Sequence, residues 1–130
     1  MTDNSRLVSL PSSKVYFITL SVFGYIDVFT RRDYIDLILE SLKLYQEEYG
    51  LIIYDWIIMT NHVHLIANVK EGSIKSLIMD FKRFTAIQMI DAIKNDPLEI
   101  RKEWMLAALK TNQKEEIFWR GIIMPKLSTT

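Results

Sequence analysis

Cysteine is absent from this sequence of 130 residues, and histidine occurs only twice. The lack of cysteine excludes disulfide scaffolds, thiol catalysis and zinc sites built on cysteine. Long apolar runs are also missing: residues 51–59 are interrupted by Asp55 and are much shorter than the roughly 20 residues of a membrane-spanning helix. Residues 1–6 lack the basic and apolar pattern of a signal peptide. We therefore expect a reduced, cytoplasmic protein without a membrane span.

An excess of charge of either sign is missing as well, because 16 basic residues balance 16 acidic ones. Binding to nucleic acid would therefore depend on a local basic patch and not on a global field. The apolar fraction of 49% can support a core, and the length corresponds to about one domain. We expect a polar N-terminal arm over residues 1–14 and a single domain over residues 15–130.

The periodicity of apolar residues switches between the period of a strand and that of a helix along the chain. It predicts strands over residues 15–22, 51–59, 62–69 and 116–124, and helices over residues 31–49, 73–93 and 98–109. Gly50 is placed to end the first helix, Ser73 to cap the second, and Thr60 and Asn61 to form a tight reversal between strands. The order β-α-β-β-α-(α)-β predicts an α+β, ferredoxin-like antiparallel sheet with helices on one face.

The two histidines, His62 and His64, are separated by one residue in a predicted strand. Side chains two positions apart on a strand point to the same face, so both imidazoles can reach one ion. Such a pair suits Mn²⁺, Zn²⁺, iron or copper better than Mg²⁺. Candidates for a third ligand are Gln88, Asp91 and Glu103, which nothing in the sequence ranks. The alternative is that both histidines are partly buried and bonded to backbone groups.

Residues 59–67 (MTNHVHLIA), after the apolar strand 54–58, resemble the HUH motif of the single-tyrosine transposases. The similarity is greatest to the branch of REP-associated and related insertion-sequence proteins. It extends to residues 28–31 (VFTR), 80–85 (DFKRFT) and 118–120 (FWR), which occur in the order that this branch shows. The resemblance covers residues 15 to 119, which is nearly the whole chain.

The resemblance implies a ferredoxin-like protein that cuts single-stranded DNA at the base of a hairpin during DNA transposition. It implies that His62 and His64 bind a divalent metal, Mg²⁺ or Mn²⁺, that polarises the scissile phosphate. In the family a tyrosine hydroxyl attacks the phosphate and stays linked to the DNA until strand transfer.

The nucleophile is where this sequence departs from the family, whose tyrosine lies on a helix after the last strand. All six tyrosines here precede the histidines, and Tyr45 and Tyr49 are expected to be core aromatics. We therefore expect a transposase-like protein impaired in cleavage. Three hypotheses remain open: an inactive truncated relative, a DNA-binding protein that uses the tyrosine of a partner chain, and a nuclease that uses metal-activated water. Loss of a C-terminal helix would also expose an apolar face, so a homodimer is expected.

Lys75, Lys82 and Arg83 on the second predicted helix are candidate contacts to the DNA backbone, and the alternative is a solvated helix surface. Trp104 and Trp119 are candidates for stacking on bases, whereas Trp56 is predicted to be buried in its strand. The competing interpretation of the whole sequence is a non-catalytic DNA- or RNA-binding or oligomerisation module.

Overall fold

A computed structural model describes residues 15–110, 117–120 and 126–127. The predicted arm, residues 1–14, lies outside the described residues. The elements are β1 (Val15–Ser21), η1 (Phe23–Tyr25), η2 (Val28–Thr30), α2 (Arg32–Tyr49), β2 (Leu51–Ile58), β3 (His62–Val69), α3 (Ile74–Asn95), α4 (Lys102–Ala108) and β4 (Lys126–Leu127). None of the described helices is both long enough and apolar enough to cross a bilayer.

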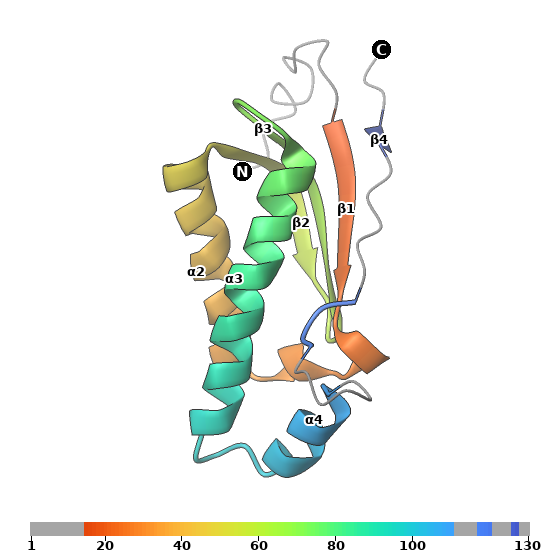
Figure 1. The fold of residues 1–130 in the computed structure, drawn as a ribbon, viewed down its shortest axis with the longest axis vertical. Coiled ribbons are helices and arrows are strands. Elements are labelled where there is room, and N and C mark those ends of the chain that lie inside the picture. Colours follow the sequence, from red (N-terminus) through yellow and green to blue (C-terminus); the bar gives the residue numbers. More distant parts are fainter. Residues whose placement is uncertain (1–14, 111–116, 121–125, 128–130) are drawn as a thin grey trace.

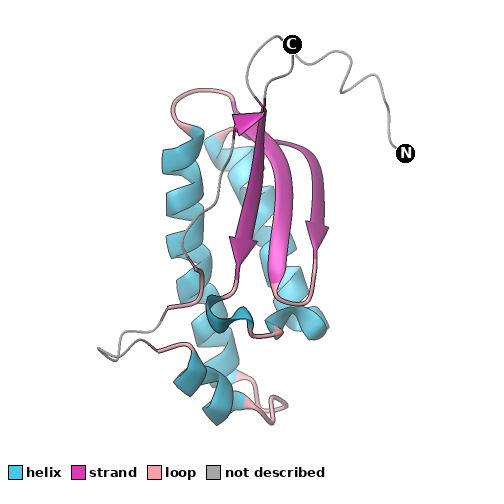
Figure 2. Ribbon diagram, turned by 90° about the vertical axis from the view of Figure 1, so that its right-hand side faces the viewer, coloured by secondary structure: helices cyan, strands magenta, loops and turns pink. Residues whose placement is uncertain are grey.

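The strands form one sheet in the order β2-β3-β1-β4, and each neighbouring pair is antiparallel. Helices α2 and α3 run along the same side of the sheet (Figure 1). In Figure 2 the strands lie in front of the two long helices, so the view is onto the face of the sheet that these helices leave uncovered. This arrangement, with β3 inserted between β1 and β2, is the ferredoxin-like α+β fold that the sequence predicts.

Alternation along β3 divides its side chains between the two faces of the sheet. Val63, Leu65 and Ala67 are buried and belong to the core, which also contains buried residues of α2 and α3. The residues between them, which include His62 and His64, are half-buried and lie on the opposite face. The core under the helices therefore fixes which face of the sheet presents the histidines.

Local signals in the sequence set several boundaries correctly. Gly50 ends α2 with a φ of 76°, a left-handed conformation that glycine adopts without strain. The Ser73 hydroxyl accepts a hydrogen bond from the backbone N–H of Ser76 and caps α3. The N–H of Met59 donates to the carbonyl of His62 at 2.8 Å, which closes the predicted reversal between β2 and β3.

Two predicted elements differ from the structure. Within the predicted strand 116–124, Trp119 forms only an isolated bridge with Val22, and residues 116 and 121–124 lie outside the described residues. The two-residue strand β4 begins later and pairs with β1. The helix predicted over residues 98–109 begins at Lys102, because the Asp96 carboxylate accepts from the N–H of Leu98 and stabilises a turn there instead.

Candidate functional site

His62 and His64 lie together at the start of β3, as the sequence predicts. Their ring centroids are 4.6 Å apart, with the ring planes at 77° to each other. The rings are half-buried, and they lie on the sheet face opposite to α2 and α3. The pair is therefore accessible and close enough for both imidazoles to contact one ion.

The side chain of Asn61 selects the tautomer of His62, that is, which ring nitrogen carries the proton. The Asn61 Oδ1 atom lies 2.7 Å from Nδ1 of His62, and its Nδ2 donates to the carbonyl of Tyr25 at 3.3 Å. Since the amide oxygen only accepts, His62 Nδ1 must carry the proton. In the neutral form of the ring, Nε2 of His62 is then the nitrogen with the lone pair, and it has no hydrogen-bond partner within the described residues.

His64 is held from the neighbouring strand. Its Nδ1 is hydrogen-bonded to the Thr19 hydroxyl at 3.0 Å, and Thr19 is its register partner on β1. The ring of Phe17 approaches the His64 ring edge-on, with centroids 5.5 Å apart. Burial, followed by the charge of His62, lowers the pKa of His64. His64 is therefore neutral near pH 7, the state in which imidazole can bind a metal.

The reversal that precedes His62 is anchored by other parts of the chain. The N–H of Val22 donates to the carbonyl of Asn61 at 2.9 Å, and the N–H of Phe29 donates to the carbonyl of Thr60 at 2.8 Å. Phe29 and Val22 are both buried in the core. The position of His62 is therefore determined by β1 and η2 as well as by its own strand.

No third protein ligand joins the pair in the described part of the chain. Gln88 and Asp91 lie on α3, which packs on the opposite face of the sheet, and Glu103 lies on α4. No group of three His, Cys, Asp or Glu residues that could hold an ion occurs among the described residues. The structure therefore does not bring the sequence-predicted third ligands to the histidines.

The predicted basic residues are distributed along α3 and do not form one patch with the histidines. Lys75 is in the first turn of α3, which follows the end of β3 that is remote from His62. Arg83 is exposed, and its guanidinium forms an ion pair with the carboxylate of Asp80 on the same helix, with 3.9 Å between the nitrogen and the oxygen. Lys82 donates to the carbonyl of Arg120 at 2.7 Å, and burial lowers its pKa.

Arg120 is a cation that the fold places beside the end of β1, the strand that pairs with the start of β3. Its backbone N–H donates to the carbonyl of Ser21 at 2.8 Å, and Ser21 is the register partner of His62. Its exposed guanidinium lies 4.4 Å from the ring centroid of Tyr25. The sequence did not identify Arg120 as a DNA contact, because its position depends on a pairing between distant segments.

The tyrosines with raised pKa values are engaged in the core. The Tyr45 hydroxyl donates to Asp80 at 2.7 Å, and that of Tyr34 donates to Asp96 at 3.0 Å. Burial is the main cause that raises the pKa of each, and the acceptor carboxylate adds to it. The prediction that Tyr45 is a core aromatic is confirmed, whereas Tyr49 is exposed at the end of α2 and that prediction is wrong.

Two of the three tryptophan predictions are corrected. Trp119 is buried, and its indole N–H donates to the Thr85 hydroxyl at 2.8 Å, so it is unavailable for stacking on bases. Trp56 is 47% exposed, because β2 is the edge strand of the sheet. Trp104 is exposed on α4, as a stacking residue must be.

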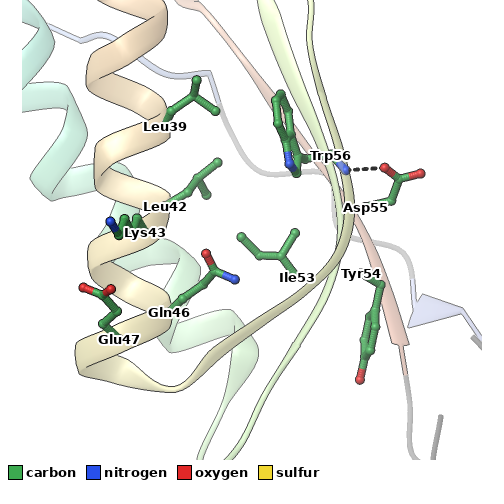
Figure 3. Close-up of a pocket in the computed structure, with 9 residues that line it drawn as sticks. All are labelled: Leu39, Leu42, Lys43, Gln46, Glu47, Ile53, Tyr54, Asp55 and Trp56. Carbon is green, nitrogen blue, oxygen red and sulfur yellow. Dashed lines mark hydrogen bonds between the residues drawn. The ribbon is translucent and has the colours of Figure 1, made fainter. Parts of the chain in front are cut away.

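A large pocket lies away from the histidines. It has a volume of about 660 Å³ between α2 and β2, and Figure 3 shows Trp56 and Ile53 facing Leu39, Leu42 and Gln46 across it. Asp55 points away from α2 in this view. The pocket contains neither histidine, so it is distinct from the candidate metal site.

Comparison with known proteins finds no matching family model, and no curated protein matches the sequence significantly. Among solved structures, the fold is similar to the crystal structure of a "putative transposase" from Deinococcus radiodurans R1. The TM-score is 0.60 at 17% sequence identity, and the match covers 89% of this chain and 79% of that one. At this identity, the similarity establishes that the two proteins share a fold.

Proposed function

We propose that this chain is a transposase-like protein that binds single-stranded, hairpin-bearing DNA at the His62–His64 pair, with a divalent metal held between the two imidazoles. Three lines support the proposal: the resemblance of residues 59–67 to the HUH motif, the shared fold with a protein described as a transposase, and the geometry of the histidines. The cytoplasmic location and the homodimer expected from the sequence stay predictions.

One observation carries the metal proposal most strongly. Both histidines use Nδ1 for a hydrogen bond to a neighbouring side chain, Asn61 or Thr19. Metal-binding histidines almost always have one ring nitrogen held in this way, which orients the other toward the ion. Two imidazoles favour Mn²⁺ over Mg²⁺, because Mg²⁺ prefers oxygen ligands. When bound, such an ion acts as a Lewis acid toward a phosphate oxygen.

Positioning of the DNA backbone is assigned to Arg120 in this proposal. Its guanidinium is exposed near the strand that pairs with His62, so a phosphate at the histidines lies on the same edge of the molecule. Lys82 of α3 donates to the backbone carbonyl of Arg120 and so helps to hold this segment in place. Because the chain has no net charge, binding through this local patch should weaken as salt is raised.

We propose that cleavage of DNA by this chain is impaired. Tyr34 and Tyr45 are buried under the sheet, with raised pKa values, and neither is suited to attack a phosphate at the histidines. The second candidate function, a DNA- or RNA-binding module without catalysis, is favoured by the lack of a third ligand among the described residues.

Incubation of the protein with hairpin-bearing single-stranded DNA and Mn²⁺ distinguishes these functions. A gel shift without cleavage supports the binding module, and a covalent protein–DNA adduct identifies an active tyrosine in this chain or its partner. Free cleaved ends without an adduct indicate metal-activated water. His64→Ala should abolish any metal-dependent cleavage, whereas Asn95→Ala on α3 should not alter it. Absence of any shift at low salt would contradict the proposal.

A further inference from the structure

A small hollow adjoins His64 on the sheet face that α2 and α3 leave uncovered. It has a volume of about 130 Å³ and lies over three strands: Phe17 comes from β1, Asp55 and Ile57 from β2, and His64 and Ile66 from β3. In the strand register, Phe17 pairs with Ile66, and Ile57 pairs with His64. The hollow is therefore continuous with the histidine pair.

The walls of the hollow are apolar and exposed. Phe17, within β1, is 37% exposed, and Ile57, near the end of β2, is 53% exposed. Exposed aromatic side chains on a ferredoxin-like sheet are suited to stack on unpaired bases. The T-shaped contact between the Phe17 and His64 rings holds Phe17 beside the candidate metal site.

Asp55 is the acidic residue among those that line the hollow. Its Oδ1 accepts a hydrogen bond from the N–H of Trp56 at 2.8 Å, and its other oxygen has no partner among the described residues. An ionised carboxylate can only accept hydrogen bonds, so it favours a ligand edge that donates. Cytosine and adenine present an exocyclic amine there, whereas thymine presents a carbonyl oxygen.

We propose that this hollow binds one unpaired nucleobase that carries an exocyclic amine, next to the phosphate at the histidine pair. The assignment rests on the proposed function and specifies which substrate the site accepts. The hollow, with a volume of about 130 Å³, has room for one ring system and is too small for a base pair. The site thus selects single-stranded nucleic acid.

Fluorescence anisotropy with labelled dC15 and dT15 in EDTA tests the proposal without a contribution from metal. The wild-type chain should bind dC15 more tightly than dT15, by about fivefold or more for one good contact to the base. Asp55→Ala should bring the ratio of the two affinities close to one. The ratio is the informative quantity, because removal of a negative charge strengthens binding to both oligonucleotides.

Phe17→Ala should weaken binding of dC15 by at least about fivefold, the lower limit for the loss of one stacked base. The matched control is Ile87→Ala, an exposed apolar residue on α3, which should leave the affinity unchanged. Phe17→Leu keeps the apolar bulk and removes the aromatic face, so it should reproduce most of the loss even if Phe17→Ala disturbs folding. Circular dichroism monitors the fold of each variant.

The outcomes separate the failure of this site from the failure of the proposed function. Wild-type protein that binds neither oligonucleotide at low salt overturns the nucleobase site, and the proposed function fails as well only if hairpin-bearing DNA with Mn²⁺ is not bound either. Wild-type binding that is unaffected in the Phe17 variants, or shows no preference for dC15, overturns the nucleobase site alone. If sedimentation shows that the wild-type protein is a dimer and that Phe17→Leu is a monomer, the sheet face around Phe17 is an interface between two copies of the chain. That result would also overturn the nucleobase site.

Discussion

Replacement of Asn61 by alanine tests whether the histidine pair is organised to bind metal. The substitution removes the acceptor that fixes the proton on Nδ1 of His62, together with the bond from Nδ2 to the carbonyl of Tyr25. The backbone of Asn61 still accepts from Val22, so the reversal itself should persist. The change is therefore directed at the orientation and tautomer of one imidazole, and it leaves both imidazoles in place.

The expected loss of metal affinity follows from two effects of this substitution. A side-chain hydrogen bond contributes about 1 kcal/mol, and its loss alone corresponds to about fivefold in a binding constant. The His62 ring also becomes free to rotate and to place its proton on Nε2, which removes the ligand lone pair. Loss of such outer-shell partners typically reduces metal affinity about 10- to 100-fold. We expect Asn61→Ala to weaken Zn²⁺ or Mn²⁺ binding within that range.

Isothermal titration calorimetry with Zn²⁺, and electron paramagnetic resonance with Mn²⁺, measure the effect. Asn95→Ala is the matched control, because Asn95 also donates from its amide but does so to Asp91 on α3. His62→Ala should eliminate specific binding. If Asn61→Ala binds as wild type does while His62→Ala does not, the orientation argument is wrong. If all three variants bind as wild type does, the histidines are not the site.

Three further changes have predicted outcomes. Burial lowers the pKa of His64, so the unfolded chain binds a proton at this residue before the folded chain does as the pH falls below the ordinary histidine pKa of about 6.5. The free energy of unfolding should therefore decrease as the pH falls from 6.5 to the lower pKa of the folded chain. Urea titrations of His64→Gln should lack this part of the decrease. Thr85→Val leaves the buried indole N–H of Trp119 unpaired and should lower the free energy of unfolding by about 1–3 kcal/mol, whereas no change in urea titrations would contradict the bond. Gly50→Ala should cost about 1–2 kcal/mol in the same assay, because φ is 76° and the new methyl group would lie 3.3 Å from Cβ of Lys70; an unchanged midpoint would argue against the left-handed conformation.

Features set by short-range patterns could be predicted from the sequence. The alternation of residues 62–69 gives both the strand and the shared face of the histidines, and Gly50 and Ser73 mark helix boundaries through their own backbone or hydroxyl groups. The ferredoxin-like fold follows from the order of these elements. Each of these inferences depends on residues that are neighbours in the chain.

Features set by long-range pairing could not be predicted in this way. Thr19 bonds to His64 across 45 positions, and the backbone N–H of Arg120 donates to the carbonyl of Ser21 on β1, which is also distant in the sequence. Trp56 lies in an apolar run that is typical of a buried strand, yet β2 is at the edge of the sheet. The position of a strand within a sheet, and the register of its neighbours, are properties of the assembled fold and not of the local sequence.

The assembled fold also explains how one short motif acquires a defined geometry. The residues around the reversal are bonded to Val22 and Phe29 through backbone groups, and both of these are buried in the core. Rotation of the histidine rings is then limited by Asn61 and Thr19. A ligand that binds to the pair therefore does not have to order the reversal, and more of its interaction energy remains as affinity. The hollow is lined by His64 itself, so the proposed nucleobase site adjoins the imidazoles, as joint recognition of a phosphate and its neighbouring base would require.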